Sequence, residues 1–251
     1  MKQLEHKVAI ITGAGSGIGR ETALLFAREG AKVVVSDINS EAGLKVVNEV
    51  KEVGGDAIFV NADTSNPEDH KNLVKQAVET YGKLDIAVNN AGIGGANASV
   101  GEYPLDSWQK VLDINLSGVF YGLRYQLPAM EKNGGGSVIN IASILGQVGF
   151  ANSSAYVASK HGVVGLTKTA GLEYGSKKVR VNAVGPGFIY TGLVNEKTMG
   201  KEALEMLETK HAMKRLGNPV EIAEMVLWLA SDKSSFVTGS YYPVDGGYLA
   251  Q

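Results

Sequence analysis

Short apolar runs rich in β-branched residues alternate with longer segments of helical periodicity along nearly the whole chain. The apolar runs predict β-strands at residues 8–12, 32–36, 57–60, 84–88, 137–141, 179–184 and 241–244. The other segments predict helices at residues 18–29, 40–53, 106–130, 153–174, 202–210 and 219–230, with one more beginning near Pro67. Because strands that are apolar throughout must be buried on both faces, this order predicts a doubly wound parallel sheet with helices on both sides.

No break in composition divides the chain, and we expect a single α/β domain over residues 1–251. The least regular stretch is residues 188–213, which follows a predicted strand. Open α/β sheets bind ligands in the crevice beyond the carboxyl ends of their strands. This stretch is therefore predicted to be a mobile substrate-binding loop with a small helix.

Charge and composition exclude several classes of protein. The formal net charge is −2 without a long basic run, which argues against a nucleic-acid partner. The absence of cysteine excludes disulfides and thiolate metal sites. No window approaches 18 uninterrupted apolar residues, and the N-terminus lacks a secretory signal, so we expect no membrane span and a cytoplasmic location.

A glycine-rich segment joins the first predicted strand to the first predicted helix. It contains Gly13, Ser16, Gly17, Ile18 and Gly19. Glycines permit a sharp turn and let backbone N–H groups approach a pyrophosphate at the helix N-terminus. An ordinary glycine-rich turn is the alternative, but the strand before and the helix after favour a Rossmann-type dinucleotide site.

Asp37 ends the second predicted strand. A carboxylate there can accept hydrogen bonds from an adenosine ribose and repel a 2′-phosphate. Its neighbours Ser36 and Ile38 are not basic, and position 16 holds serine rather than arginine. The sequence thus favours NAD(H) over NADP(H), with Ile38 beside the cofactor; a plain turn residue is the alternative for Asp37.

Polar and small residues also end the next two predicted strands. Asp63 and Thr64 follow the third strand, and Asn90, Ala91 and Gly92 follow the fourth. Each group alone is as compatible with a turn as with a ligand contact. Because both end parallel strands at the same edge of the sheet, we expect them to contact the cofactor.

Tyr156 and Lys160 lie four residues apart and so share a helix face, with β-carbons about 5–6 Å apart. A phenol has an ordinary pKa of about 10, and a neighbouring ammonium is expected to lower it towards the range of a general acid. Many surface helices carry such a pair without function. The dinucleotide site and the upstream Ser143 favour a catalytic role, since reduction of a carbonyl needs a proton donor and a hydroxyl near the oxygen.

The ordered set of motifs resembles the short-chain dehydrogenase/reductase family over nearly the whole chain. The matching positions are residues 12–19, Asp63, residues 89–92, Asn115, Ser143, Tyr156, Lys160, Pro186, Gly187, Thr191, Thr238, Gly239 and residues 245–247. The resemblance implies an oxidoreductase that transfers a hydride between NAD(H) and a carbonyl compound or secondary alcohol.

The resemblance also implies roles for single residues. Tyr156 is similar to the family's acid/base, and Lys160 to the residue that lowers the phenol's pKa and holds the nicotinamide ribose. Ser143 matches the hydroxyl that orients the carbonyl oxygen, and Asn115 the residue that distorts the central helix and holds a water behind the lysine. The segment around the nicotinamide carboxamide is matched by Pro186, Gly187, Ile189 and Thr191.

The expected substrate is a moderately apolar ketone or secondary alcohol, since the candidate pocket residues are mostly apolar. These candidates are Ile93, Leu145, Gln147, Phe150, Phe188, Tyr190, Met199 and Met206. Two alternatives remain. A 3-oxoacyl-thioester reductase of fatty-acid synthesis usually goes with NADP, against which Asp37 argues. A non-catalytic dinucleotide-binding regulator would be free to lose Ser143, Tyr156 or Lys160.

The resemblance further implies a homotetramer in which the helices at 106–130 and 153–174 pack against their copies. The C-terminal residues 246–251 resemble tails at subunit interfaces, and some relatives with a similar terminal Gln bind a structural magnesium. No other metal site is expected. Lys168, Lys177, Lys178 and Arg180 are expected to be solvated, and the four histidines, including His211 beside the substrate loop, show no metal spacing.

Overall fold

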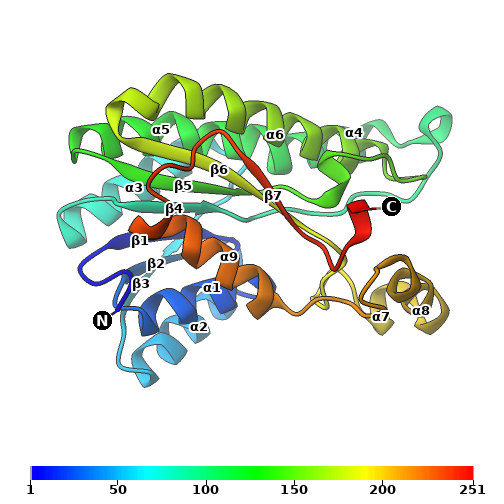
Figure 1. The fold of residues 1–251 in the computed structure, drawn as a ribbon, viewed down its shortest axis with the longest axis horizontal. Helices are drawn as coiled ribbons and strands as arrows, with labels where there is room; N and C mark the ends of the chain where they lie inside the picture. The colour runs from blue at the N-terminus through cyan, green and yellow to red at the C-terminus, as the bar shows by residue number, and fades with distance from the viewer. Residues whose placement is uncertain (1, 251) are drawn as a thin grey trace.

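The computed structural model describes residues 2–250, and its centre is one seven-stranded parallel sheet in the order β3-β2-β1-β4-β5-β6-β7 (Figure 1). The strands are β1 Val8–Thr12, β2 Lys32–Asp37, β3 Asp56–Asn61, β4 Ile86–Asn89, β5 Gly136–Ile141, β6 Val179–Pro186 and β7 Tyr241–Val244. The strand order reverses direction between β1 and β4, which is where doubly wound sheets open a ligand crevice. The predicted fold class is confirmed.

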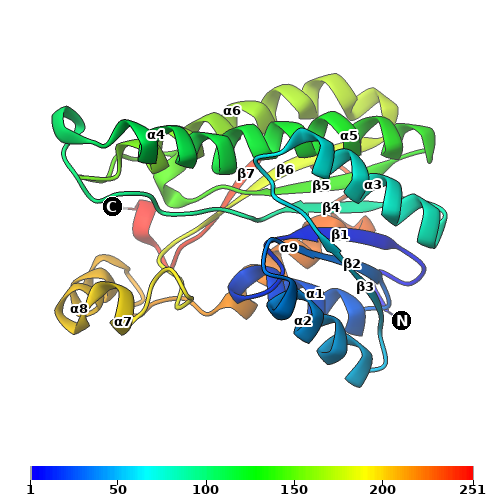
Figure 2. The same ribbon diagram turned by 180° about the vertical axis from the view of Figure 1, so that it is seen from behind.

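Helices cover both faces of the sheet (Figures 1 and 2). One face carries α1 Gly17–Arg28, α2 Ser40–Glu52 and α9 Pro219–Ala230; the other carries α3 Pro67–Tyr81, α4 Leu105–Leu112, α5 Gly118–Lys132 and α6 Ser154–Tyr174. Two separate apolar cores result. Neighbouring strand residues point into opposite cores, as Ile11 does into the first and Ile10 into the second. This explains why apolar residues predominate on both faces of the strands.

The single helix predicted at residues 106–130 is interrupted. Between α4 and α5 the backbone forms a π-helical segment, Asp113–Ser117, with the fully buried Asn115 at its centre. The Asn115 amide binds the backbone of Ile93 rather than solvent, and π-helical turns commonly mark functional sites. The distortion implied by the family resemblance is present at the expected residue.

The predicted substrate loop holds two helices instead of one. After β6 the chain forms α7 Glu196–Met199 and α8 Lys201–Lys210, which project beyond the carboxyl ends of the strands (Figures 1 and 2). A β-bridge between Ile189 and Gly217 closes the base of this segment. Within residues 2–250 the structure has no helix with the length and hydropathy needed to cross a membrane.

Arg180 is not the solvated charge that its sequence context suggested. Its guanidinium is half-buried and donates hydrogen bonds to the carbonyl oxygens of Leu229 and Ser231, at 2.8 and 3.1 Å. Arg180 therefore ties β6 to the C-terminal end of α9, and its burial lowers its pKa.

Candidate active site

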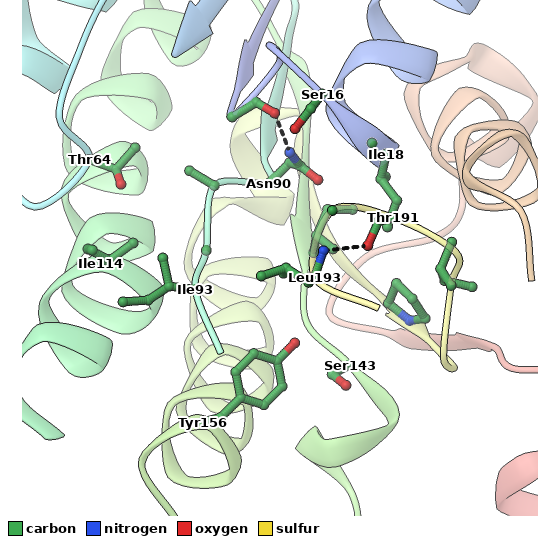
Figure 3. Close-up of a pocket in the computed structure, with 18 of the residues that line it drawn as sticks. Ser16, Ile18, Thr64, Asn90, Ile93, Ile114, Ser143, Tyr156, Thr191 and Leu193 are labelled. Carbon is green, nitrogen blue, oxygen red and sulfur yellow. Dashed lines mark hydrogen bonds between the residues drawn. The ribbon is translucent and has the colours of Figure 1, made fainter. Parts of the chain in front are cut away.

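A cavity of about 420 Å³ opens at the carboxyl ends of the strands, where the order of the sheet reverses. Nearly all of the predicted cofactor and catalytic residues line it; the exceptions are Gly19 and Asn115. Figure 3 shows Ser16 and Ile18 towards one end of the pocket and Ser143 and Tyr156 towards the other. One cavity thus joins the predicted dinucleotide site to the predicted proton-handling residues.

The N-terminus of α1 faces this cavity without a side-chain cap. Ser16 is the N-cap residue, yet its side chain makes no capping hydrogen bond, and the first turn holds no acidic residue. Gly13 adopts a left-handed backbone with φ of 62°, and a Cβ on Gly19 would lie 2.6 Å from the Asn90 amide nitrogen. Free N–H groups and the helix dipole at such an end fit a pyrophosphate.

Asn90 braces the glycine segment. Its amide donates to the carbonyl oxygens of Thr12 and Gly13, at 2.9 and 3.1 Å, and Figure 3 shows the amide pointing at the segment. The Thr12 hydroxyl in turn accepts from the Asn90 backbone N–H at 3.0 Å. Of the two sequence-based alternatives for Asn90, the structure therefore supports turn chemistry for its side chain, at a position that also lines the cavity.

Asp37 is held in place by the glycine segment. One carboxylate oxygen accepts the Gly15 N–H at 2.8 Å, and the other accepts the Asn39 N–H at 2.9 Å. Among the described residues that line the cavity, Lys160 is the only basic one. Since Lys160 belongs to the opposite, catalytic group, the Asp37 end offers a carboxylate for a ribose diol and no cation for a 2′-phosphate.

Asp63 and Thr64 are fixed by local hydrogen bonds at the end of β3. Asp63 accepts from the backbone N–H and hydroxyl of Ser65, at 2.9 and 2.7 Å. His70 Nε2 lies 3.0 Å from the Thr64 carbonyl oxygen, and burial lowers the pKa of this histidine. Sequence reasoning missed the role of His70, because nothing in its spacing connects it to residue 64.

Tyr156 and Lys160 lie one turn apart on α6, and Ser143 follows β5. The Lys160 ammonium is 5.5 Å from the centre of the Tyr156 ring and donates a 2.7 Å hydrogen bond to the Ile141 carbonyl. The Ser143 oxygen accepts the Leu145 N–H at 3.1 Å, and the Ser143 hydroxyl acts to lower the pKa of Tyr156. The predicted trio is thus brought together.

The direction predicted for the phenol's pKa is wrong for this structure. Burial raises the pKa of Tyr156, and the hydrogen bond from Ser143 offsets only part of that rise. Burial also lowers the pKa of Lys160 to about 8, and its amine is directed at Ile141. A shared helix face predicted the proximity, but desolvation penalises the charged form of both groups.

Asn115 lies behind the cavity. Its side chain accepts from the Ile93 N–H at 2.8 Å and donates to the Ile93 carbonyl at 2.9 Å. It also reaches the Ser159 hydroxyl at 3.4 Å, which donates to the Tyr156 carbonyl. Asn115 therefore links the segment after β4 to the catalytic helix; its implied hold on a water stays a prediction.

The apolar wall differs from the predicted one. Of the eight candidate pocket residues, only Ile93 lines the cavity. Phe150 and Phe188 pack with His211 and Tyr248 in a ring cluster, while Tyr190, Met199 and Met206 are exposed. The wall is completed by Ile114, Leu193 and Val194, and Figure 3 shows the labelled Ile93, Ile114 and Leu193 around the pocket. Irregular loop residues such as 193 and 194 carry no periodic signal.

Comparisons with known proteins identify the family. A cyclohexanol dehydrogenase from Acinetobacter sp. (strain SE19) is 51% identical over 249 residues, covering 99% of this chain and 97% of that protein. A family model described as "Enoyl-(Acyl carrier protein) reductase" matches residues 13–249. The chain belongs to the short-chain dehydrogenase/reductase family. The family inferred from the sequence motifs is confirmed, and the protein is an oxidoreductase.

Solved structures of the short-chain dehydrogenase/reductase family match the whole fold. Levodione reductase superimposes with a TM-score of 0.96 at 38% identity, covering 98% of this chain and 99% of that one. Carveol dehydrogenase from Mycobacterium avium, in complex with NAD, does so with a TM-score of 0.96 at 32% identity, covering all of both chains.

No finding supports the predicted structural magnesium. Within residues 2–250 no group of three His, Cys, Asp or Glu side chains could hold a metal ion. Gln251, on which that prediction rested, lies outside the described residues.

Proposed function

We propose that this protein is an NAD-dependent dehydrogenase that interconverts a compact, largely apolar cyclic secondary alcohol and the corresponding ketone. The observation that carries the proposal is the convergence of Ser143, Tyr156 and Lys160 on one cavity that also contains Asp37 and the open end of α1. When bound, NAD(H) supplies or accepts the hydride. The chain's own residues then have to manage the proton and the charge on the substrate oxygen.

Tyr156 is the proton-transfer group in this proposal. In reduction its hydroxyl gives a proton to the carbonyl oxygen, and in oxidation its phenolate takes the proton of the alcohol. Ser143 donates a hydrogen bond to the same oxygen, where negative charge develops. Burial of Tyr156 keeps the phenol protonated over a wide pH range, which suits its role as an acid.

Lys160 supports Tyr156 and holds the cofactor. The Lys160 ammonium has three N–H donors, and one of them donates to the Ile141 carbonyl oxygen. Two donors therefore remain for ribose hydroxyls. In this proposal the positive charge on Lys160, 5.5 Å from the Tyr156 ring centre, offsets part of the cost that burial places on the phenolate form needed for alcohol oxidation.

The cyclic substrate class is supported by the relatives and by the cavity wall. The similar proteins are named for cyclohexanol, levodione and carveol. In this chain Ile93, Ile114, Leu193 and Val194 form apolar surface near the reacting groups, and no described arginine lines the cavity to bind a phosphate or carboxylate. A six-membered carbocycle bearing one hydroxyl or keto group fits such a wall.

A 3-oxoacyl-thioester reductase is the second candidate, favoured by the acyl-carrier-protein description of the matching family model. Asp37 and the lack of a cation beside it speak against the NADP(H) that this role usually uses. Initial rates on cyclohexanol, substituted cyclohexanones and an acetoacetyl thioester, each with NAD(H) and NADP(H), distinguish the two. Activity confined to the thioester would refute the cyclic-alcohol proposal.

We also propose a cytoplasmic homotetramer. Phe120 on α5 and Leu172 on α6 are 48% and 86% exposed, which leaves large apolar side chains on the outer surface of these helices. Burial of such residues against a second copy would stabilise the assembly. Light scattering should give about four times the chain mass of 26.5 kDa. A mass of one chain would exclude the tetramer, and imaging of the tagged protein tests the location.

A further inference from the structure

Ser143 is hydrogen-bonded to a residue from the far end of the chain. The hydroxyl of Tyr241, on the edge strand β7, donates to the Ser143 backbone carbonyl at 2.9 Å, across 98 positions of sequence. Tyr241 does not line the cavity. Its contact with the site therefore passes through the backbone of Ser143.

Gly185 makes room for this contact. In the β6–β7 register, Ala183 pairs with Tyr241 and Gly185 with Pro243. A Cβ at position 185 would overlap the hydroxyl and ring of Tyr241. The absence of a side chain on Gly185 thus leaves room for the Tyr241 ring and lets its hydroxyl reach Ser143.

Ser143 accepts three hydrogen bonds, two at its backbone carbonyl oxygen and one at its side-chain oxygen. Its carbonyl oxygen accepts from Tyr241 and also from the Gly146 N–H at 2.8 Å. Its side-chain oxygen accepts the Leu145 N–H at 3.1 Å. These bonds set the direction in which the Ser143 hydroxyl donates, and Tyr241 supplies the only one of the three donors that comes from outside residues 143–146.

We propose that Tyr241 is a positioning residue that orients the Ser143 hydroxyl towards Tyr156 and the substrate oxygen. This inference rests on the proposed function, because it gives Ser143 and Tyr156 their roles in proton transfer. Burial, followed by the charge of Asp245, raises the pKa of Tyr241, so its hydroxyl remains a donor throughout the working pH range.

Tyr241→Phe tests the proposal most cleanly, because it removes the hydroxyl and keeps the ring over Gly185. Loss of one well-placed hydrogen bond should lower kcat about tenfold. The dissociation constant of NADH should stay within about twofold, since Asp37 and the glycine segment are untouched. Ser143 lowers the pKa of Tyr156, so the pH at which alcohol oxidation is half-maximal should move upward.

Tyr242→Phe is the matched control. Tyr242 neighbours Tyr241 on β7 but packs on the opposite face against Trp228, with ring centres 5.9 Å apart. The kcat and pH profile of the Tyr242→Phe variant should equal those of the wild type. A merely structural role for Tyr241 would reduce the amount of active enzyme without moving the pH profile.

Gly185→Ala provides an independent test by pushing the Tyr241 ring away from Ser143. It should lower kcat and shift the pH profile as Tyr241→Phe does. In a Tyr241→Val background, where the ring is absent, the same alanine should have little further effect. An equal effect of Gly185→Ala in both backgrounds would overturn the proposed coupling.

Tyr156→Phe, measured in the same series, separates the two levels of the proposal. If Tyr156→Phe retains turnover, the proposed function itself is wrong. If Tyr156→Phe is inactive while Tyr241→Phe matches the wild type in kcat and pH profile, only the positioning role of Tyr241 is refuted.

Discussion

Lys160 lies one helical turn from Tyr156, 5.5 Å from its ring centre, yet donates its 2.7 Å hydrogen bond to the Ile141 carbonyl. Lys160 is buried and Tyr156 is partly buried, and desolvation disfavours the charged form of each. The lowered pKa of Lys160, about 8, brings its ammonium close to a change of protonation, which makes the site sensitive to pH and to what binds beside it.

Binding of NADH should take up a proton above pH 8. The pKa of Lys160 is lowered to about 8, so below this pH the ammonium that holds the ribose is already present. Above it, the neutral amine must regain a proton on binding, and affinity should fall by up to about tenfold per pH unit. Calorimetry in buffers of different ionisation enthalpy measures the uptake. Lys160→Met should lose it; uptake that persists in Lys160→Met would assign the proton to another group.

Asp37 should set the preference for NADH over NADPH. Asp37→Asn keeps the size of the side chain and removes the charge that repels a 2′-phosphate. The ratio of kcat/KM for the two cofactors should fall at least about tenfold, equivalent to about 1.4 kcal/mol. Asp63→Asn, at another position in the cavity wall, is the control and should leave the ratio unchanged. An unchanged ratio in Asp37→Asn would contradict the assigned role.

Ser143→Ala should lower kcat by about 100-fold or more, because it removes a donor to the substrate oxygen. Ser154→Ala, at the first residue of α6, is the matched control. The Ser154 hydroxyl is buried and has no hydrogen-bond partner within residues 2–250, so its removal should change kcat by less than about twofold. Similar losses in both variants would argue for a general packing effect. Steady-state rates with a cyclic alcohol measure both.

Gln126→Leu should destabilise the fold without touching the cavity. Gln126 and Asn89 exchange two buried hydrogen bonds, at 2.8 and 3.1 Å, and Asn89 also binds Asn140 at 2.9 Å. Leaving the Asn89 amide partly unsatisfied should cost about 1–3 kcal/mol in the free energy of unfolding. Gln109→Leu, on the exposed surface of α4, should stay within about 0.5 kcal/mol. Urea titration followed by circular dichroism compares them, and equal midpoints would contradict the role of this network.

The sheet could be predicted from sequence because the strands contain short, mostly apolar runs, and most of these runs are followed by polar or glycine-rich residues. The break at Asp113–Ser117 could not be located from periodicity, since apolar spacing continues through it and the cause is the long-range contact of Asn115 with Ile93. Family resemblance, rather than local pattern, pointed to that residue.

Site residues at the ends of strands could be predicted from the sequence, whereas those that depend on contacts between distant parts of the chain could not. Asp37, Asp63 and Ser143 could be predicted because each ends a strand or comes shortly after one. The apolar wall at Leu193 and Val194 lies in an irregular segment, so no pattern identified it. The raised pKa of Tyr156 depends on burial by the whole fold, which a pair of residues on a helix does not reveal.

The central claim is that Tyr156 transfers the proton while the rest of the cavity binds NAD(H). Replacing Tyr156 with Phe removes only the hydroxyl, so it tests this claim most directly. Turnover of a cyclic alcohol should fall by at least about 1,000-fold, near 4 kcal/mol, while the NADH dissociation constant measured by fluorescence stays within about threefold. Turnover close to that of the wild type, with the variant binding NADH normally, would contradict the account.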